Sequence, residues 1–171
     1  EAQKALSFLS VDVIGSTKMK ASEDKAMVEY TFAEYKKFID EILMANRVWK
    51  VAWTPDGIMC AFWASDDAVN AAREIIVGLD SFNKYINQMQ TPFKVRCGIN
   101  FGKVMFDISA EMEEISDEVI DVAGHLQKFA NPNSIWITEK TLALVTNKEG
   151  FKTIDTQVDE QTVAEWTNTS K

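Results

Sequence analysis

The sequence is poor in the residues that anchor small secreted or zinc-bound proteins. It contains two cysteines, Cys60 and Cys97, and a single histidine, His125. Both cysteines stand inside apolar, strand-like runs, which argues against a disulfide framework, and one histidine is too few for an ordinary zinc site. We therefore expect two buried free thiols and a reducing, cytoplasmic location.

Long apolar runs and blocks of basic residues are missing as well. No stretch approaches the length of a membrane span, the mean hydropathy is -0.15, and the chain does not open with a signal-peptide pattern. Aspartate and glutamate number 26 against 18 lysines and arginines, which gives a net charge of -8. The field of such a protein opposes nucleic acid, so the sequence predicts neither a membrane segment nor a nucleic-acid partner.

The remaining composition is that of one globular domain. Of the 171 residues, 46% are hydrophobic and 26% are charged, values typical of a folded domain of this length. We expect a single domain over residues 1–171. Because the first residue is Glu1 rather than Met, we also expect this domain to be excised from a longer, multidomain protein.

Hydrophobic spacing and turn residues predict alternating strands and helices. We expect helices over 22–46, 64–86 and 117–130. We expect strands over 5–13, 47–53, 58–63, 134–137, 151–154 and 163–166, of which the last two lie at sheet edges. Two further strands are expected in 93–106, with a break between them at 100–102. The first half has the order βαββαβ. The predicted fold class is therefore α/β (α+β), with a ferredoxin-like core in which helices pack on one face of a mainly antiparallel sheet.

A single aspartate interrupts the first apolar strand. Asp12 lies within FLSVDV, where an unpaired carboxylate is costly. Gly15, Ser16 and Thr17 follow at a predicted helix start, where backbone N–H groups and hydroxyls can form a phosphate cradle. Turn and cap roles for Asp12 and Ser16 explain the same residues, because such caps are common. The pattern alone leaves both roles open.

A second aspartate stands at the tip of a predicted hairpin. Asp56 belongs to the segment TPDG at 54–57, which by itself is a turn. If the first strand lies beside this hairpin, Asp12 and Asp56 converge at one end of the sheet. Two carboxylates that face triphosphate oxygens are a common way for proteins to hold Mg²⁺, so the pair predicts a metal-assisted phosphate site.

A third polar group lies on the helix predicted over 117–130. Asp121, His125 and Lys128 follow one another at i, i+4 and i+7, so they share one face opposite an apolar stripe. A polar stripe of this kind is ordinarily the solvated side of a helix. The spacing alone therefore favours no function.

Four segments, in this order and spacing, resemble the motifs of the class III nucleotidyl (adenylate/guanylate) cyclase catalytic domain. FLSVDVIGST (8–17) resembles the strand and turn D-I-x-G-S/F-T, and WTPDGIMCAF (53–62) resembles the hairpin G-D-G-x-M-A-x-F. VRCGINFGKV (95–104) is similar to V-R-x-G-I-x-x-G-x-V. The segment 120–141, with DVAGHLQKFANPNSIWITEKT, is similar to V-N-x-A-x-R-L-Q-x-x-A followed by a turn and I-x-I/V-S/T-x-x-T.

The resemblance implies an enzyme that converts a nucleoside triphosphate to a 3′,5′-cyclic nucleotide and pyrophosphate. Two Mg²⁺ or Mn²⁺ ions would act at the interface of a homodimer. Asp12 and Asp56 match the family's two metal aspartates, and the carbonyl of Val13 matches a further metal ligand. ATP or GTP is the expected substrate, with a pyrimidine nucleotide left open.

The resemblance also assigns the contacts to phosphate and base. Gly15, Ser16 and Thr17 match the phosphate-binding turn. Lys103 takes the place of an arginine that contacts the triphosphate, and Glu114 falls where a residue reads the base.

Several positions depart from the family pattern. The transition-state asparagine is Asp121 here, and the transition-state arginine is His125. Ala52 stands at the spacing of the base-reading lysine, and Lys50 could serve there only if two residues are inserted. The tail after Phe151 lacks the Lys-Gly pair that supplies another triphosphate contact.

These departures leave two interpretations. In the first, the chain is a working cyclase whose catalytic residues are Asp12, Asp56, Asp121 and His125. Asp121 and His125 would then form an ion pair that keeps the imidazole protonated as a partial arginine substitute. In the second, it is a catalytically degenerate cyclase-like module that binds a nucleotide or only dimerises, and regulates a fused sensor or effector domain. The intact metal aspartates favour the enzyme.

Overall fold

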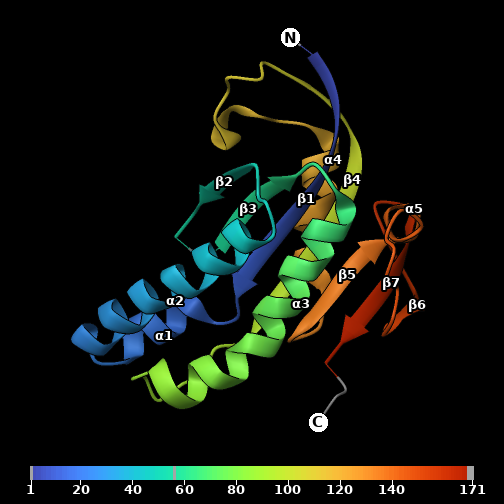
Figure 1. Cartoon of the computed structure of the whole chain (residues 1–171). Coiled ribbons are helices and arrows are strands. Elements are labelled where there is room, and N and C mark those ends of the chain that lie inside the picture. The colour runs from blue at the N-terminus through green and yellow to red at the C-terminus, as the bar shows by residue number, and fades with distance from the viewer. Residues whose placement is uncertain (1, 56, 169–171) are drawn as a thin grey trace.

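In residues 2–55 and 57–168, which the computed structural model describes, seven strands form one sheet in the order β2-β3-β1-β4-β5-β7-β6 (Figure 1). They are β1 (Ala2–Val13), β2 (Lys50–Trp53), β3 (Gly57–Phe62), β4 (Val95–Phe106), β5 (Ser134–Thr138), β6 (Phe151–Val158) and β7 (Gln161–Thr167). Only β4 and β5 run parallel; every other neighbouring pair in this part of the chain is antiparallel. The predicted mainly antiparallel sheet is confirmed.

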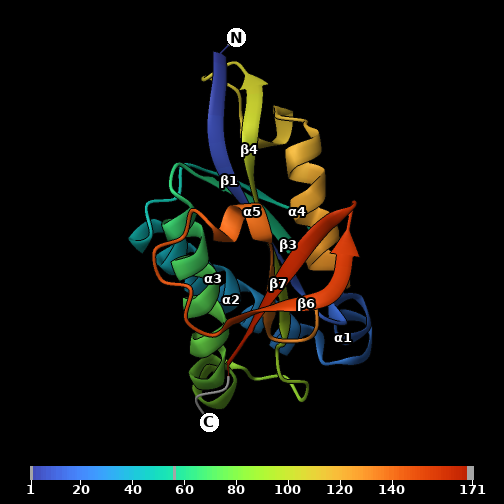
Figure 2. The same ribbon diagram turned by 90° about the vertical axis from the view of Figure 1, so that its right-hand side faces the viewer.

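Helices cover both faces of this sheet. They are α1 (Ser16–Ser22), α2 (Lys25–Ala45), α3 (Ser65–Ser81), the π-helical turn η1 (Phe82–Ile86), the 3₁₀ turn η2 (Met112–Glu114), α4 (Glu118–Phe129) and α5 (Glu139–Leu142). The pair α2 and α3 packs on one face, as predicted for the βαββαβ half, and α4 packs on the other (Figure 2). Within the described ranges, no helix is both long and apolar enough to cross a membrane.

The alternation of side chains along β1 decides which residues reach which face. Leu9, Val11 and Val13 belong to the cluster that contains the α2 and α3 side chains, whereas Phe8 belongs to the cluster on the α4 side. Because successive side chains of a strand point to opposite faces, Asp12 lies on the α4 side together with Phe8. The carboxyl end of β1 thereby places the carboxylate of Asp12 beside α4.

The predicted break within 93–106 is wrong, because β4 runs unbroken from Val95 to Phe106. Asn100 and Gly102, which suggested a turn, serve tertiary packing instead. The Asn100 side chain donates a hydrogen bond to the Val119 carbonyl at 3.1 Å and accepts one from Thr138 at 2.9 Å. A Cβ at Gly102 would lie 2.5 Å from a methyl group of Val119, so glycine allows α4 to approach the strand.

Two further expectations need correction, and one is confirmed. The strand over residues 161–167 is not at an edge, because β7 pairs with both β5 and β6. The helix expected from residue 22 starts later: α1 ends at Ser22, and Asp24 caps α2 by accepting a hydrogen bond from the Met27 amide. Cys60 and Cys97 are buried free thiols, and burial raises the pKa of each.

Candidate functional site

Asp12 stands at the carboxyl end of β1 in a half-buried position. Its Cα partners are Gly57 on β3 and Arg96 on β4. The Gln127 side chain of α4 reaches it, with Nε2 3.4 Å from Asp12 Oδ2, and also accepts a hydrogen bond from Ser10 Oγ at 3.3 Å. The carboxylate is therefore held between the sheet and α4.

The predicted hairpin closes against this end of β1. Thr54 and Gly57 join its two sides: the Thr54 amide donates to the Gly57 carbonyl at 2.8 Å, and the Gly57 amide donates to Thr54 Oγ1 at 3.0 Å. A Cβ on Gly57 would lie 2.3 Å from the Val11 carbonyl oxygen, so glycine allows the close approach. Asp56 itself lies outside the described residues. Its neighbour in the chain, Gly57, is nevertheless the strand partner of Asp12.

Two cavities flank the end of β1. One, of about 320 Å³, is lined by Ser10, Val11, Asp12, Thr54, Gly57, Ile58, Met59 and Gln127. The other, of about 190 Å³, is lined by Val13, Lys20, Phe32, Tyr35, Lys36, Trp53, Thr54, Pro55 and Gly57. Lys20 Nζ donates to the Pro55 carbonyl at 2.8 Å, and it lies 4.6 Å from the centre of the Phe32 ring. An ammonium group is thus fixed beside the hairpin that carries Asp56.

The turn after β1 has the geometry of a helix start. Gly15 is the N-cap residue of α1 and has a φ of 70°, a left-handed conformation that favours glycine. Ser16 is buried, whereas Thr17 is exposed. Because the N-cap position belongs to Gly15, neither Asp12 nor Ser16 is the cap residue of this helix. The cap role considered for these two residues is therefore wrong.

Oxygen donors at the end of β1 are of the kind that hard divalent cations prefer. Mg²⁺ in nucleotide sites commonly takes one or two carboxylates and completes its shell with water and phosphate oxygens. The Asp12 carboxylate and the Val13 carbonyl are such donors. Within residues 2–55 and 57–168, no group of three or more His, Cys, Asp or Glu residues could hold a metal by itself. The Asp12 carboxylate and the Val13 carbonyl fit a Mg²⁺ ion that takes its remaining ligands from phosphate and water.

The two candidate base-reading residues are bound within their own neighbourhood. Lys50 Nζ donates to the Ala110 carbonyl and lies 4.7 Å from the centre of the Trp49 ring. Glu114 forms a capping box with Glu111, whose amide donates to Glu114 Oε1 at 2.8 Å. The structure brings β2 and η2 together, and both side chains are already engaged: Lys50 binds the Ala110 carbonyl, and Glu114 binds the Glu111 amide.

The predicted ion pair between Asp121 and His125 is wrong. His125 Nδ1 lies instead 2.7 Å from Asp159 Oδ2, in the turn between β6 and β7, and Asp121 stays on the exposed face of α4. The neighbouring Val158 is buried in a cluster with side chains of α4, which brings this turn beside the helix. Docking of the hairpin therefore decides the partner of the histidine.

Lys103 lies far from Asp12 within one chain. On the β1–β4 pair, Lys103 is opposite Ala5, whereas Asp12 is opposite Arg96. Seven residues separate the two levels, which corresponds to about 24 Å at roughly 3.4 Å per residue. One chain therefore assembles Asp12, the turn at Gly15 and the hairpin at one end, and keeps Lys103 at a distant level.

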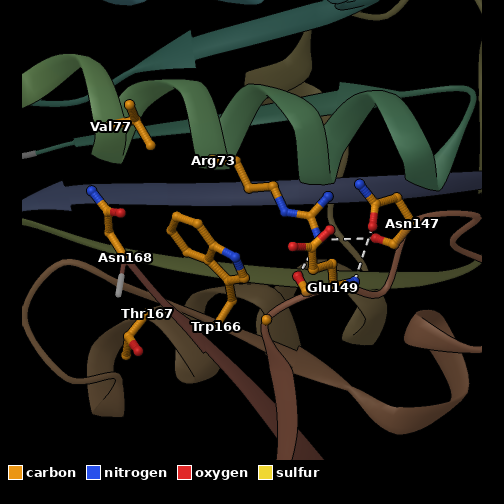
Figure 3. A pocket seen from close by; sticks show the side chains of 8 residues that line it. Arg73, Val77, Asn147, Glu149, Trp166, Thr167 and Asn168 are labelled. Carbon is orange, nitrogen blue, oxygen red and sulfur yellow. Dashed lines mark hydrogen bonds between the residues drawn. The ribbon is translucent and has the colours of Figure 1, made fainter. Parts of the chain in front are cut away.

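A separate cavity of about 240 Å³ lies between α3 and β7 (Figure 3). Its lining includes Arg73, which donates hydrogen bonds to the carbonyls of Asn147 and Glu149 at 2.9 and 2.8 Å and lies 5.3 Å from the centre of the Phe151 ring. None of the residues proposed for chemistry lines it. Arg73 fixes a loop there, so this cavity is not the candidate site.

Four residues of the candidate region carry little or no signal in the sequence. Ser10 and Gln127 contact each other across 117 positions of sequence, and Asp159 contacts His125 across 34. The sequence around Lys20 indicates only a solvated residue near the start of a helix. No local spacing predicts these contacts, because the sheet and the docked hairpin create them.

The family comparison covers nearly the whole chain. The sequence model of the family described as "Adenylate and Guanylate cyclase catalytic domain" matches residues 1–164. A search among curated proteins finds no match.

Solved structures agree with this fold. The guanylate cyclase domain of RhGC from Catenaria anguillulae, solved with GTP, has a TM-score of 0.82 and 17% identity, covering 97% of each chain. The adenylate/guanylate cyclase/hydrolase from Silicibacter pomeroyi has a TM-score of 0.79 and 17% identity, covering 97% of this chain and 98% of the other. The adenylyl cyclase CyaB from P. aeruginosa has a TM-score of 0.80 and 14% identity, covering 96% and 93%. At these identities the likeness concerns the fold, and together with the match over residues 1–164 it leads to one conclusion: the chain belongs to the adenylate and guanylate cyclase catalytic domain family.

Proposed function

We propose that this domain is a nucleotidyl cyclase that converts a nucleoside triphosphate to a 3′,5′-cyclic nucleotide and pyrophosphate, using two Mg²⁺ or Mn²⁺ ions. One observation carries the proposal. Asp12 interrupts a strand whose other residues at this end are buried, and its strand partner is Gly57, the residue that follows Asp56. A carboxylate at this position has no use in packing, whereas it suits a metal–phosphate site.

Five residues and one backbone carbonyl at this end of the sheet would have a task in the proposed reaction, with support from Gln127 of α4. Asp12, Asp56 and the Val13 carbonyl would hold the ions, which would acidify the ribose 3′-hydroxyl and neutralise charge on the phosphates. Backbone N–H groups of Gly15, Ser16 and Thr17 would bind phosphate oxygens. Gln127 keeps the Asp12 carboxylate in place from α4.

We propose that the site is completed by a second copy of the chain. Lys103 is about 24 Å from the level of Asp12 along the sheet, so a single chain cannot direct both at one triphosphate. In a homodimer, one copy would supply Asp12 and Asp56, and the other would supply His125 and Lys103 and would bring Asp121 close to the triphosphate. A fused sensor or effector domain would control how the two copies meet.

The structure leaves the preferred base of the nucleotide open, so turnover has to be measured with each of the four triphosphates. Lys50 and Glu114 are engaged in contacts to Ala110 and Glu111, so neither is free to read adenine without giving up a bond. We rank ATP and GTP first and keep CTP and UTP as real candidates. The domain's compartment is proposed to be the cytoplasm, where nucleoside triphosphates and reduced thiols coexist.

A specific observation favours the second candidate function, a degenerate module that binds nucleotide or dimerises. Asp121, Asp159 and Glu160 place three carboxylates on α4 and the adjacent turn. Carboxylates close to a triphosphate oppose its binding. If they defeat catalysis, the remaining site at Asp12 would still bind a metal–nucleotide complex and regulate a fused partner.

Turnover separates these functions. The purified domain would be incubated at dimerising concentration with Mg²⁺ or Mn²⁺ and each of ATP, GTP, CTP and UTP, with products resolved by mass spectrometry. A 3′,5′-cyclic product that is lost in Asp12→Asn and in Asp56→Asn supports the cyclase. Asp155→Asn, the same exchange at an exposed position on β6, should keep full activity. No product from any nucleotide would overturn the cyclase, and thermal stabilisation by Mg²⁺ and a triphosphate would then favour the binding module.

A further inference from the structure

The only histidine of the chain is held by a carboxylate from a distant segment. His125 Nδ1 lies 2.7 Å from Asp159 Oδ2, a short distance for a charge-assisted hydrogen bond. The two side chains keep 49% and 39% of their surface exposed, so the imidazole is oriented without being covered. A fixed orientation and an open ring edge are what a reacting histidine requires.

The turn that supplies Asp159 is unusual for its sequence. Asp159 and Glu160 have φ values of 48° and 65°, in the left-handed region. Two-residue hairpin turns of this kind ordinarily use Asn-Gly, because glycine takes a positive φ freely. Backbone strain of this sort persists where the surrounding structure holds it, and it is concentrated at functional sites.

Packing of the hairpin holds the strained turn against α4. Val158, the residue before the turn, is buried in one cluster with Val122 and Leu126 of α4. The apolar contact sets the distance between hairpin and helix, and the carboxylate of Asp159 then faces the imidazole of His125. The pair is therefore built by tertiary structure rather than by chance contact of two long side chains.

The bond also decides which imidazole nitrogen is available. A carboxylate only accepts hydrogen bonds, so Nδ1 carries the proton and donates it to Asp159. In the neutral ring, Nε2 then keeps its lone pair. We propose that His125 Nε2 is the general base that takes the proton of the ribose 3′-hydroxyl, and that Asp159 is the residue that positions it; this inference rests on the proposed function.

The step balances without any further reactant. The O–H bond of the 3′-hydroxyl breaks, and its proton moves to Nε2 of His125. The 3′-oxygen forms a bond to the α-phosphorus, while the bond from that phosphorus to the bridging oxygen breaks and its electron pair leaves with pyrophosphate. Asp159 holds the ring in the correct tautomer and stabilises the imidazolium that forms, as the aspartate does in hydrolytic triads.

The charged groups around the imidazole of His125 come from two elements. Asp121 and Lys128 share the α4 face with His125, Asp159 contacts it from the β6–β7 turn, and Glu160 is the next residue of that turn. The three carboxylates and one ammonium group leave this surface negatively charged.

The test compares two variants with a matched control. His125→Gln removes the base but can still form hydrogen bonds, and Asp159→Asn keeps the shape of the positioning residue without its charge. Asp155→Asn makes the same exchange on the exposed side of β6. We expect His125→Gln to lower kcat about 100-fold and Asp159→Asn to lower it at least about tenfold, with KM changed less than about twofold.

Two readouts separate positioning from a merely structural role. The kcat of the wild-type enzyme should fall as pH is lowered, because a protonated base cannot accept a proton, and this fall should disappear in His125→Gln. Because the chain has one histidine, ¹⁵N NMR of the imidazole reports its tautomer without overlap. Nδ1 should carry the proton in the neutral wild-type ring. This preference should be lost in Asp159→Asn and kept in the control Asp155→Asn.

The outcomes also separate this inference from the function on which it rests. If the wild type makes a cyclic nucleotide and Asp159→Asn keeps its kcat, the inference is wrong and the cyclase stands. A kcat that falls as pH is raised would likewise overturn it, because it would mark a cationic donor. If the wild type makes no product from any of the four triphosphates, the proposed function fails, and the general base with it.

Discussion

Gly98 of β4 lies directly under the backbone of Gln127 in α4. A Cβ at position 98 would be 2.4 Å from the Gln127 amide nitrogen and 2.3 Å from the Ala123 carbonyl oxygen. No side chain fits in this space, so the helix rests on the bare strand. That close contact is what allows the Gln127 side chain to reach Asp12 at the end of the neighbouring strand.

The first prediction concerns this contact. Gly98→Ala should push α4 away from β4 and destabilise the fold by about 1–3 kcal/mol, the usual cost of overpacking against rigid backbone. Gly124→Ala is the matched control, because a Cβ there meets only the Met59 methyl group, at 4.0 Å. In the middle of a helix it should stabilise by up to about 1 kcal/mol. Urea unfolding of both variants measures the difference, and equal stabilities would contradict the packing argument.

The second prediction concerns the bond from Gln127 to Asp12. Gln127→Ala should leave the fold intact but weaken metal-dependent triphosphate binding or turnover about 10- to 100-fold, as loss of a residue that orients a metal ligand commonly does. Titration with Mn²⁺ in the presence of a triphosphate measures the change. Gln90→Ala makes the same exchange on a remote exposed loop and should have no effect. Unchanged Mn²⁺ dependence in Gln127→Ala would show that Asp12 needs no support from α4.

The arrangement around Asp12, which we propose to bind the metal ions, can be predicted from the sequence because its signals are local. Asp12, Gly15 and the hairpin each lie in a short segment whose strand, turn or helix start is fixed by nearby residues. The strand pairing of Asp12 with Gly57 then follows from the βαββαβ order. Local patterns and the sheet topology agree on the pairing of β1 with β3, while the convergence of Asp12 with Asp56 stays a prediction, because Asp56 lies outside the described residues.

The surroundings of His125 depend on contacts that no local pattern contains. The spacing of Asp121 and His125 suggested a pair within α4, but the docked hairpin supplies the carboxylate of Asp159 as the partner of the histidine. Asn100 and Gly102 suggested a turn, whereas they serve the approach of α4 to an unbroken strand. In each case tertiary packing outweighs the local preference of the residues.

The third prediction concerns acid stability. Asp66 in the first turn of α3 accepts hydrogen bonds from the Thr146 amide at 2.7 Å and from its hydroxyl at 2.8 Å. The hydrogen bond from the Thr146 amide has the larger effect and the bond from its hydroxyl the smaller, and together they hold the pKa of Asp66 below its ordinary value. A carboxyl group whose pKa is lower in the folded state adds stability above the unfolded value, near 3.9, and this stability is lost as pH falls through the folded pKa.

Asp66→Asn should therefore lower the melting temperature at pH 7, and the gap to the wild type should narrow as pH falls below about 4. Glu29→Gln, at an exposed position on α2, is the control for the loss of one negative charge. Melting curves between pH 3 and pH 7 give the melting temperatures of the wild type and of both variants, and hence the gap at each pH. A gap that stays constant over this range would mean that the hydrogen bonds of Asp66 do not depend on its ionisation.

The last prediction concerns Asp121, which stands on the exposed face of α4 beside His125. A carboxylate about 4 Å from a phosphate costs roughly 4 kcal/mol at an effective dielectric constant of 20, and screening by solvent reduces this. In the proposed homodimer, Asp121→Asn should therefore raise kcat/KM at least about tenfold, which corresponds to about 1.4 kcal/mol. Steady-state kinetics with the triphosphate that gives the cyclic product measure it.

Glu41→Gln, which removes one exposed negative charge from α2, separates this local effect from a change in the field of the whole protein. If both variants gain equally, the gain is due to net charge, and Asp121 does not face the triphosphate. If only Asp121→Asn gains, the α4 face belongs to the site. A loss of activity in Asp121→Asn, with the dimer intact, would instead mean that this carboxylate takes part in the reaction, because removing a merely repulsive charge cannot slow it.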